Sequence, residues 1–164
     1  MNNNFCTDLH HMFNNLYKHH FPFKERDIPL NGMYILFEKT EFSHGYDRIV
    51  RIGTHTGHNQ LRSRLKQHFI VQNKDRSIFR KHIGRAILNK ENDPFLEQWN
   101  LDLTPKKERI KHSNNVDFDK QKQIEKLVSE YIQNNFSFVV FEVEEKEERL
   151  DLESKIISTL SCAG

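Results

Sequence analysis

Cysteines and membrane-length apolar runs are scarce in this 164-residue chain, and its net charge is only +2. The two cysteines, Cys6 and Cys162, lie outside any CxxC spacing, so alone they build neither a disulfide framework nor a zinc site. No window approaches the roughly 20 apolar residues of a membrane span, and the N-terminus is neither basic nor apolar enough for a secretory signal. We therefore expect a soluble, intracellular (cytoplasmic) protein without a membrane partner.

The length fits one compact domain of about 100 to 200 residues. A hydrophobic content of 36% and a mean hydropathy of −0.78 make the chain polar, but thirteen phenylalanines supply the bulky apolar surface that disordered chains lack. We expect a single domain over 1–164, with an N-terminal helical extension over 1–30 and an insertion over 71–118.

The small net charge conceals two unlike regions. From Arg48 to Lys90 there are eleven lysines and arginines and one acid, Asp75, a net charge of +10, whereas the remainder has 14 bases and 22 acids, a net charge of −8. A basic stretch of this kind is typical of proteins that neutralise phosphates. The alternative is a solvated basic face that pairs with the acidic segment 142–148.

Hydrophobic spacing predicts helices over 5–21, 61–69, 77–88, 120–134 and 147–160, and strands over 32–38, 47–53 and 136–143. The first two strands read as a hairpin, and Pro22 ends the first helix. The predicted class is α/β (α+β), with a small three-stranded, mostly antiparallel sheet flanked by helices and a helical insertion.

The first predicted helix carries four histidines, and one of them follows Cys6 by four residues. The histidines are His10, His11, His19 and His20. A metal is conceivable there, but no matching second half of a ligand set is visible. Surface histidines are the favoured interpretation.

The last predicted helix contains an anomaly. Glu153 lies three residues after Leu150 and four before Ile157, inside a broad apolar arc. A carboxylate on the core side usually neutralises, pairs with a base or binds a metal, because burying it unpaired is costly. A salt bridge to an arginine at the helix edge is the competing explanation.

The helix over 61–69 offers a complementary pair. Arg64 and His68 are four residues apart and project from the flank of its apolar stripe. An arginine matches a phosphate with two parallel donors, and a histidine can carry a proton at neutral pH. Alternatively, both side chains lie at the border of the core, with their polar ends in water.

Four motifs occur in order along the chain: Gly32-Met33-Tyr34 in a first strand, Arg51-Ile52-Gly53 in a second, then LRSRLKQHF and a late LESKII. In this order and local context they resemble the GIY-YIG nucleases. The resemblance covers 32–69 well and 136–160 loosely. It implies a small three-stranded sheet flanked by helices and metal-dependent cleavage of phosphodiesters.

By this resemblance Tyr34 is the first motif tyrosine, Arg64 the helix arginine that grips phosphate, His68 the residue one turn later, and Glu153 the ligand of Mg²⁺ or Mn²⁺. Tyr34 and His68 compete as the general base, with Tyr34 slightly ahead. Arg51 stands where the family usually has a tyrosine, so it either takes over a phosphate contact or marks a binding domain that has lost catalysis. The asparagine that the family commonly carries beyond this glutamate would fall after Gly164.

The sequence therefore predicts a divalent-metal-dependent endonuclease that acts on DNA rather than RNA, and cutting both strands would favour a homodimer. The rivals are an inactive nucleic-acid-binding module of the same fold and a protein-interaction domain with a basic face. Five basic side chains are expected to contact nucleic acid: Arg62, Lys66, Arg80, Lys81 and Arg85.

Overall fold

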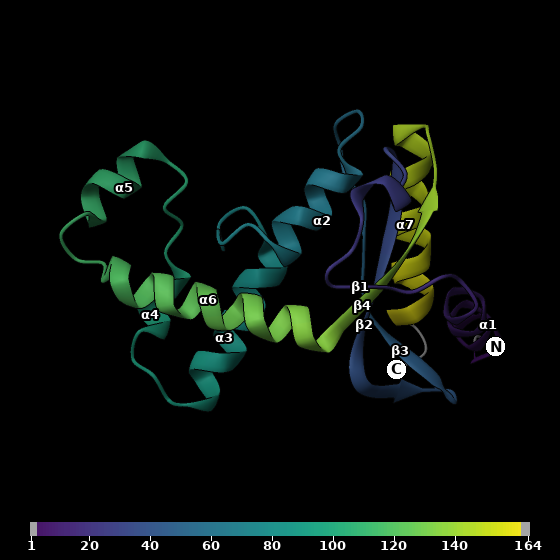
Figure 1. The fold of residues 1–164 in the computed structure, drawn as a ribbon, viewed down its shortest axis with the longest axis horizontal. Helices are drawn as coiled ribbons and strands as arrows, with labels where there is room; N and C mark the ends of the chain where they lie inside the picture. The colour runs from purple at the N-terminus through teal and green to yellow at the C-terminus, as the bar shows by residue number, and fades with distance from the viewer. Residues whose placement is uncertain (1–2, 162–164) are drawn as a thin grey trace. The chain divides into compact units, whose positions relative to one another are not determined.

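The computed structural model describes residues 3–161, and Figure 1 shows their helices and strands. The elements, in chain order, are α1 (Asn3–Asn14), β1 (His19–His20), a 3-10 turn η1 (Glu25–Asp27), β2 (Gly32–Ser43), β3 (Tyr46–Gly53), α2 (Leu61–Phe69), α3 (Ile78–Lys90), α4 (Leu96–Asn100), α5 (Lys106–His112), α6 (Phe118–Asn135), β4 (Phe136–Glu142) and α7 (Lys146–Ser161). Within the described part of the chain, none of the helices is long and apolar enough to cross a membrane.

The chain divides into two compact units. The first combines the residues up to 65 with those from 135 onward, and the second comprises 66–134. The expected insertion over 71–118 falls inside the second unit, which also takes in the end of α2 and nearly all of α6. The first unit contains the sheet, and the second is helical.

The sheet has the antiparallel order β1-β4-β2-β3, so it contains four strands rather than the three expected. The additional strand, β1, is two residues long and pairs His19 with Phe138. This pairing also corrects the expected helix over 5–21: α1 ends at Asn14, because the chain must extend to reach β4. The class predicted from the sequence, a mixed α/β fold with an antiparallel sheet flanked by helices, is confirmed.

Alternate residues of β2 build the main core of the first unit. Met33, Ile35 and Phe37 pack in one cluster with Phe13 of α1 and Ile156 of α7. The strand is buried on its other face as well, since every residue from 32 to 37 is buried. A central strand covered on both faces reads as a continuous apolar run, which is why GMYILF was easy to identify from the sequence.

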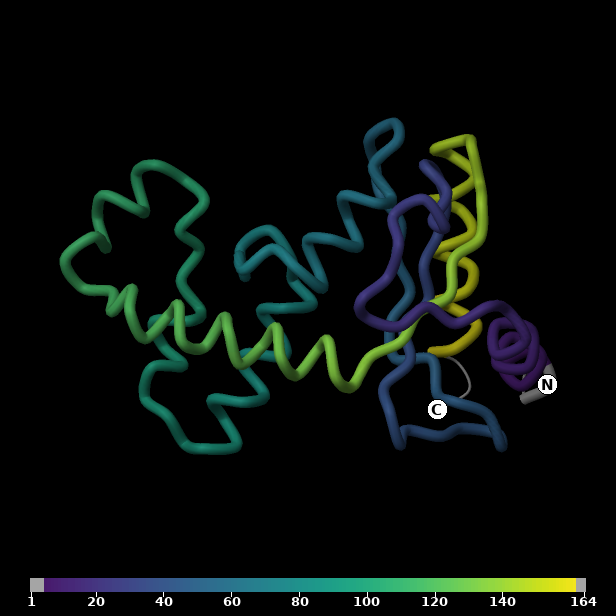
Figure 2. Tube along the Cα trace, viewed as in Figure 1, coloured from purple at the N-terminus to yellow at the C-terminus, as the bar shows by residue number. Residues whose placement is uncertain are grey.

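A two-residue turn joins β2 to β3, and the trace in Figure 2 shows the chain reversing there. Ser43 pairs with Tyr46, leaving His44 and Gly45 in the loop at φ values of 54° and 81°. Positive φ at both positions is the signature of a type I′ turn, which favours asparagine and glycine. A histidine at the first position is unusual and brings an imidazole to the tip of the hairpin.

On α7 the buried stripe is narrower than the sequence suggested. Leu152, Ile156 and Leu160 pack on or beside the core, whereas Leu150 and Ile157 are 38% and 44% exposed. Glu153 is nonetheless half-buried. Its partial burial therefore comes from groups that the rest of the first unit places around it, and not from the arc between Leu150 and Ile157.

Candidate active site

Tyr34 is fixed in the middle of the sheet. It is 1% exposed and lies opposite Gly53 of β3 and Val140 of β4. A Cβ atom on Gly53 would lie 2.2 Å from the Tyr34 hydroxyl oxygen, so only glycine leaves room for the phenol. The second motif glycine thus holds the first motif tyrosine in place.

Glu153 of α7 is surrounded by positive charge. The carboxylate accepts a hydrogen bond from the main-chain amide of Thr54 and lies within electrostatic reach of Arg51 and Arg64. Burial raises the pKa of the Glu153 carboxyl above its ordinary value of 4.5, and the two arginines and the Thr54 amide oppose the rise. The structure therefore brings together three of the predicted site residues, from β3, α2 and α7.

Arg51 reaches this cluster because of its register. It lies opposite Leu36, two positions from the Tyr34–Gly53 pair, so it shares a face of the sheet with Tyr34. A tyrosine at this position would point the same way. The substitution in the second motif consequently replaces a phenol by a guanidinium at the same place in the sheet.

Hydrogen bonds attach the loop after β3 to the beginning of β2, a feature that the sequence pattern did not predict. The Thr54 hydroxyl donates to the Gly32 carbonyl at 2.8 Å. His55 is buried: its Nδ1–H donates to the Gly57 carbonyl at 2.7 Å, and its Nε2 accepts from the Gly32 amide at 3.2 Å. Burial lowers the pKa of His55, which favours this neutral form. The one sequence feature that pointed to an ordered loop here was the position of the segment Gly53–Gly57 between a predicted strand and a predicted helix.

His68 has a different environment from the other predicted site residues. It belongs to the second unit, where its side chain is fully buried. Its Nδ1 lies 2.7 Å from the Ser77 hydroxyl, and its ring meets Phe79 edge to face. These contacts give His68 a packing role at the junction of α2 and α3.

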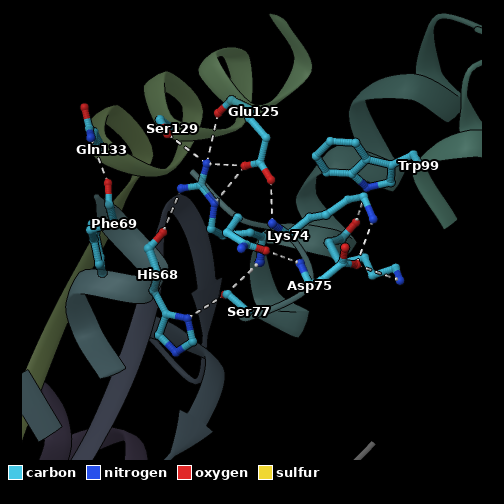
Figure 3. Close-up of polar contacts among 12 residues, drawn as sticks. His68, Phe69, Lys74, Asp75, Ser77, Trp99, Glu125, Ser129 and Gln133 are labelled. Carbon is cyan, nitrogen blue, oxygen red and sulfur yellow. Dashed lines mark hydrogen bonds and ion pairs between the residues drawn. The ribbon is translucent and has the colours of Figure 1, made fainter. Parts of the chain in front are cut away.

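Two of the five predicted nucleic-acid contacts, Arg80 and Lys81, are buried within the second unit. Figure 3 shows polar contacts of this unit, with Asp75, Glu125 and Ser129 labelled. Arg80 is 0% exposed and donates to the Glu125 carboxylate at 2.7 and 3.1 Å and to the Ser129 hydroxyl at 2.8 Å. The Lys81 ammonium lies 3.5 Å from the Asp75 carboxylate, at a side-chain exposure of 11%. Both charges are thus paired with carboxylates of the second unit, an arrangement that does not favour contact with phosphates.

The other three remain partly accessible. Arg62 donates from Nε to the Ile28 carbonyl at 2.7 Å, and Arg85 donates from Nε to Asn100 at 2.6 Å. Lys66 is half-buried. Because Lys74 is also buried and paired with Asp75, part of the +10 charge of the segment 48–90 has a structural use.

In a comparison with protein-family models the chain matches the GIY-YIG domain over residues 6–164. The match spans nearly the whole chain, so the chain belongs to the GIY-YIG domain family, whose members are generally endonucleases. Neither a search of curated proteins nor a search of solved structures found a match.

The residues around Glu153 fit a hard divalent cation. Mg²⁺ is commonly held by one or two carboxylates, with water and substrate phosphates completing its shell. Glu153 offers one carboxylate whose ionised form is disfavoured by burial, so a bound cation would stabilise that form. Arg51 and Arg64 add positive charge that would favour a phosphate beside such a cation.

Proposed function

We propose that this chain is a divalent-metal-dependent endonuclease that hydrolyses phosphodiester bonds in DNA. The observation that supports it best is the gathering of Arg51, Arg64 and the Thr54 amide around the half-buried Glu153. A carboxylate with two guanidinium groups is suited to hold a cation and a phosphate together. Membership of the nuclease-type family supports the same reaction.

Each side chain has a distinct task in this proposal. Glu153 would hold Mg²⁺ or Mn²⁺, which when bound supplies positive charge to the reacting phosphate and makes water more acidic. Arg64 would grip the scissile phosphate through two parallel hydrogen bonds. Arg51 would contact a neighbouring phosphate oxygen in place of the family's tyrosine.

Tyr34 is the preferred proton acceptor. Its hydroxyl lies against Gly53, the residue before Thr54, whose amide contacts Glu153. The His68 ring contacts the Ser77 hydroxyl and the Phe79 ring within the second unit, which favours the phenol over the imidazole. Replacing Tyr34 by phenylalanine, which keeps the packing on Gly53, should abolish cleavage if this assignment is right.

Incubation with supercoiled plasmid, with and without Mg²⁺ or Mn²⁺, tests the proposal. We expect metal-dependent nicking that Glu153→Gln abolishes and that Glu148→Gln, an exposed glutamate of the same helix, leaves unchanged. Unchanged cutting by Glu153→Gln would refute the metal-ligand assignment. The ratio of linear to nicked product over time shows whether two chains act together, as in a homodimer.

One observation favours a second candidate function, a nucleic-acid-binding module without catalysis. Arg51 occupies the place of the second motif tyrosine and adds positive charge where a phenol is usual in the family. Such a module would retard DNA in a salt-sensitive way. Retardation without cutting at any metal concentration would favour it over the nuclease.

A further inference from the structure

A second cluster of chemically distinct ligands lies in the first unit, between α1 and the tip of the β2–β3 hairpin. It consists of Cys6 and His10, one turn apart on α1, and His44 in the type I′ turn. Their candidate ligand atoms all lie within 4.8 Å of one another. None of the three is among the residues around Glu153, so the proposed cleavage reaction does not use them.

The two sulfur–nitrogen separations match those of a tetrahedral metal centre. Cys6 Sγ is 3.7 Å from His10 Nδ1 and 3.4 Å from His44 Nε2. Zinc binds sulfur at about 2.3 Å and imidazole nitrogen at about 2.0 to 2.1 Å, so ligands at the tetrahedral angle lie about 3.6 Å apart. The two observed distances fall on either side of this value.

The thiol makes only weak hydrogen bonds to the two imidazoles, because sulfur is a weak donor and a weak acceptor. Cys6 has a single S–H proton, so it can donate to one imidazole at a time. His10 Nδ1 already donates to the Cys6 carbonyl at 2.9 Å, and His10 Nε2 accepts from the Ile49 amide at 3.3 Å. Both ring nitrogens of His10 therefore have main-chain partners. To bind an ion, one nitrogen must give up its hydrogen bond, which limits the affinity of the site for the metal.

The cluster is accessible to an ion. It lines a pocket of about 290 Å³ together with five other residues: Ser43, Arg48, Ile49, Leu160 and Ser161. Arg48, the charged residue among these five, directs its guanidinium to Glu41 at 3.3 Å. His44 is exposed, whereas Cys6 and His10 are each only 4% exposed. The pocket leaves room for a water as the fourth ligand.

From these observations we infer that Cys6, His10 and His44 form a zinc site that fastens α1 to the β2–β3 hairpin. One thiolate and two imidazoles select zinc over Mg²⁺, because hard cations prefer oxygen ligands. Since α1 contributes Phe13 to the core, a clamp at Cys6 and His10 would stabilise the first unit. This inference is independent of the proposed nuclease function.

The binding test uses the full chain stripped with a chelator and then titrated with Zn²⁺ or with Co²⁺ as a spectroscopic probe. We expect one equivalent to bind and Co²⁺ to show a thiolate charge-transfer band with tetrahedral visible bands. Zinc should also raise the Tm, and excess Mg²⁺ should not displace it. Absence of stoichiometric binding, or cobalt bands without the thiolate feature, would overturn the inference.

Matched variants locate the site. Cys6→Ser should remove the thiolate band, and His44→Asn should weaken zinc binding by more than about tenfold while suiting the left-handed turn. Cys162→Ser and His11→Gln should bind zinc as the parent does; Cys162 lies outside the described residues, and His11 is an exposed neighbour of His10. Equal loss in either control, with the fold intact by circular dichroism, would overturn the assignment.

Discussion

Glu125 and Glu153 each lie near basic side chains, but their surroundings differ. The difference distinguishes an ion pair that stabilises the fold from a candidate active site. Glu125 in the second unit is 3% exposed, and Arg80 donates to its carboxylate and also to its carbonyl. Glu153 in the first unit is half-buried, and burial raises its pKa although two arginines lie nearby. In the first arrangement the carboxylate and the guanidinium satisfy each other within the protein, whereas the second is the arrangement that we propose to hold a cation and a phosphate.

The comparison shows that charge in a sequence does not reveal its use. Arg80 and Arg64 both belong to the basic segment 48–90 and both lie on helices. Arg80 is paired internally because the fold brings it to Glu125 and Ser129, which lie 45 and 49 residues later in the sequence. Hydrogen bonding and burial, rather than residue type, distinguish Arg80, which stabilises the fold, from Arg64, which lies at the candidate site.

Removing the buried carboxylate should have the largest effect. Glu125→Ala leaves the Arg80 guanidinium buried without its carboxylate partner, so we expect a loss of about 3 to 5 kcal/mol in the free energy of unfolding. Urea denaturation followed by circular dichroism measures it. Glu130→Ala, on the exposed side of α6 beside Lys126, should cost under about 1 kcal/mol.

The paired replacement sharpens this result. If the cost comes from an uncompensated charge, Arg80→Met combined with Glu125→Leu should recover most of the stability lost in Glu125→Ala. Equal instability of the single and double variants would instead mean that the network of Ser129, Glu125 and the His68 carbonyl stabilises the unit as a whole.

Replacing Arg64 at the candidate site should lower the rate of cleavage and leave the stability of the fold nearly unchanged. Arg64→Ala removes a preorganised donor to phosphate, and we expect cleavage of plasmid to fall by about 10² to 10³. Its unfolding midpoint should stay close to that of the parent chain. Arg109→Ala, at an exposed position of α5, should retain full activity. A large loss of stability in Arg64→Ala would place Arg64 with Arg80 among structural residues.

Local patterns predicted much of the first unit. The hairpin and the helix over 61–69 were identified because buried strands and amphipathic helices have distinct periods, and α2 spans Leu61–Phe69 as expected. β1 was not predicted because a strand of two residues is too short to show an alternation of apolar and polar side chains. The short helices α4 and α5 were missed for a similar reason, since proline-flanked polar segments read as loops.

The candidate sites were predictable only where the partners share an element or a family motif. Glu153 was singled out by its place on one helix and by the resemblance, and the structure brings it to Arg51 and Arg64. Cys6 and His10 were noticed as neighbours on a helix, but His44 is 38 residues from Cys6 and is joined to it only by the hairpin. Pairings across such distances depend on tertiary packing, which is also why the burial of Arg80 was missed.

The smallest expected effect concerns stability at the candidate site in metal-free buffer. The folded state holds a proton on Glu153 more tightly than the unfolded state, so stabilisation by this group is present below the ordinary pKa of 4.5 and is lost as the pH rises through the higher folded value. Glu153→Gln has no such loss. We therefore expect its urea midpoint to exceed that of the parent chain at neutral pH, with the difference shrinking toward zero on acidification below the ordinary pKa. Glu148→Gln should show no pH-dependent gain. A Glu153→Gln variant less stable than the parent at neutral pH would mean that the arginines fully compensate the carboxylate, as Arg80 does for Glu125, and the contrast between the two units would fail.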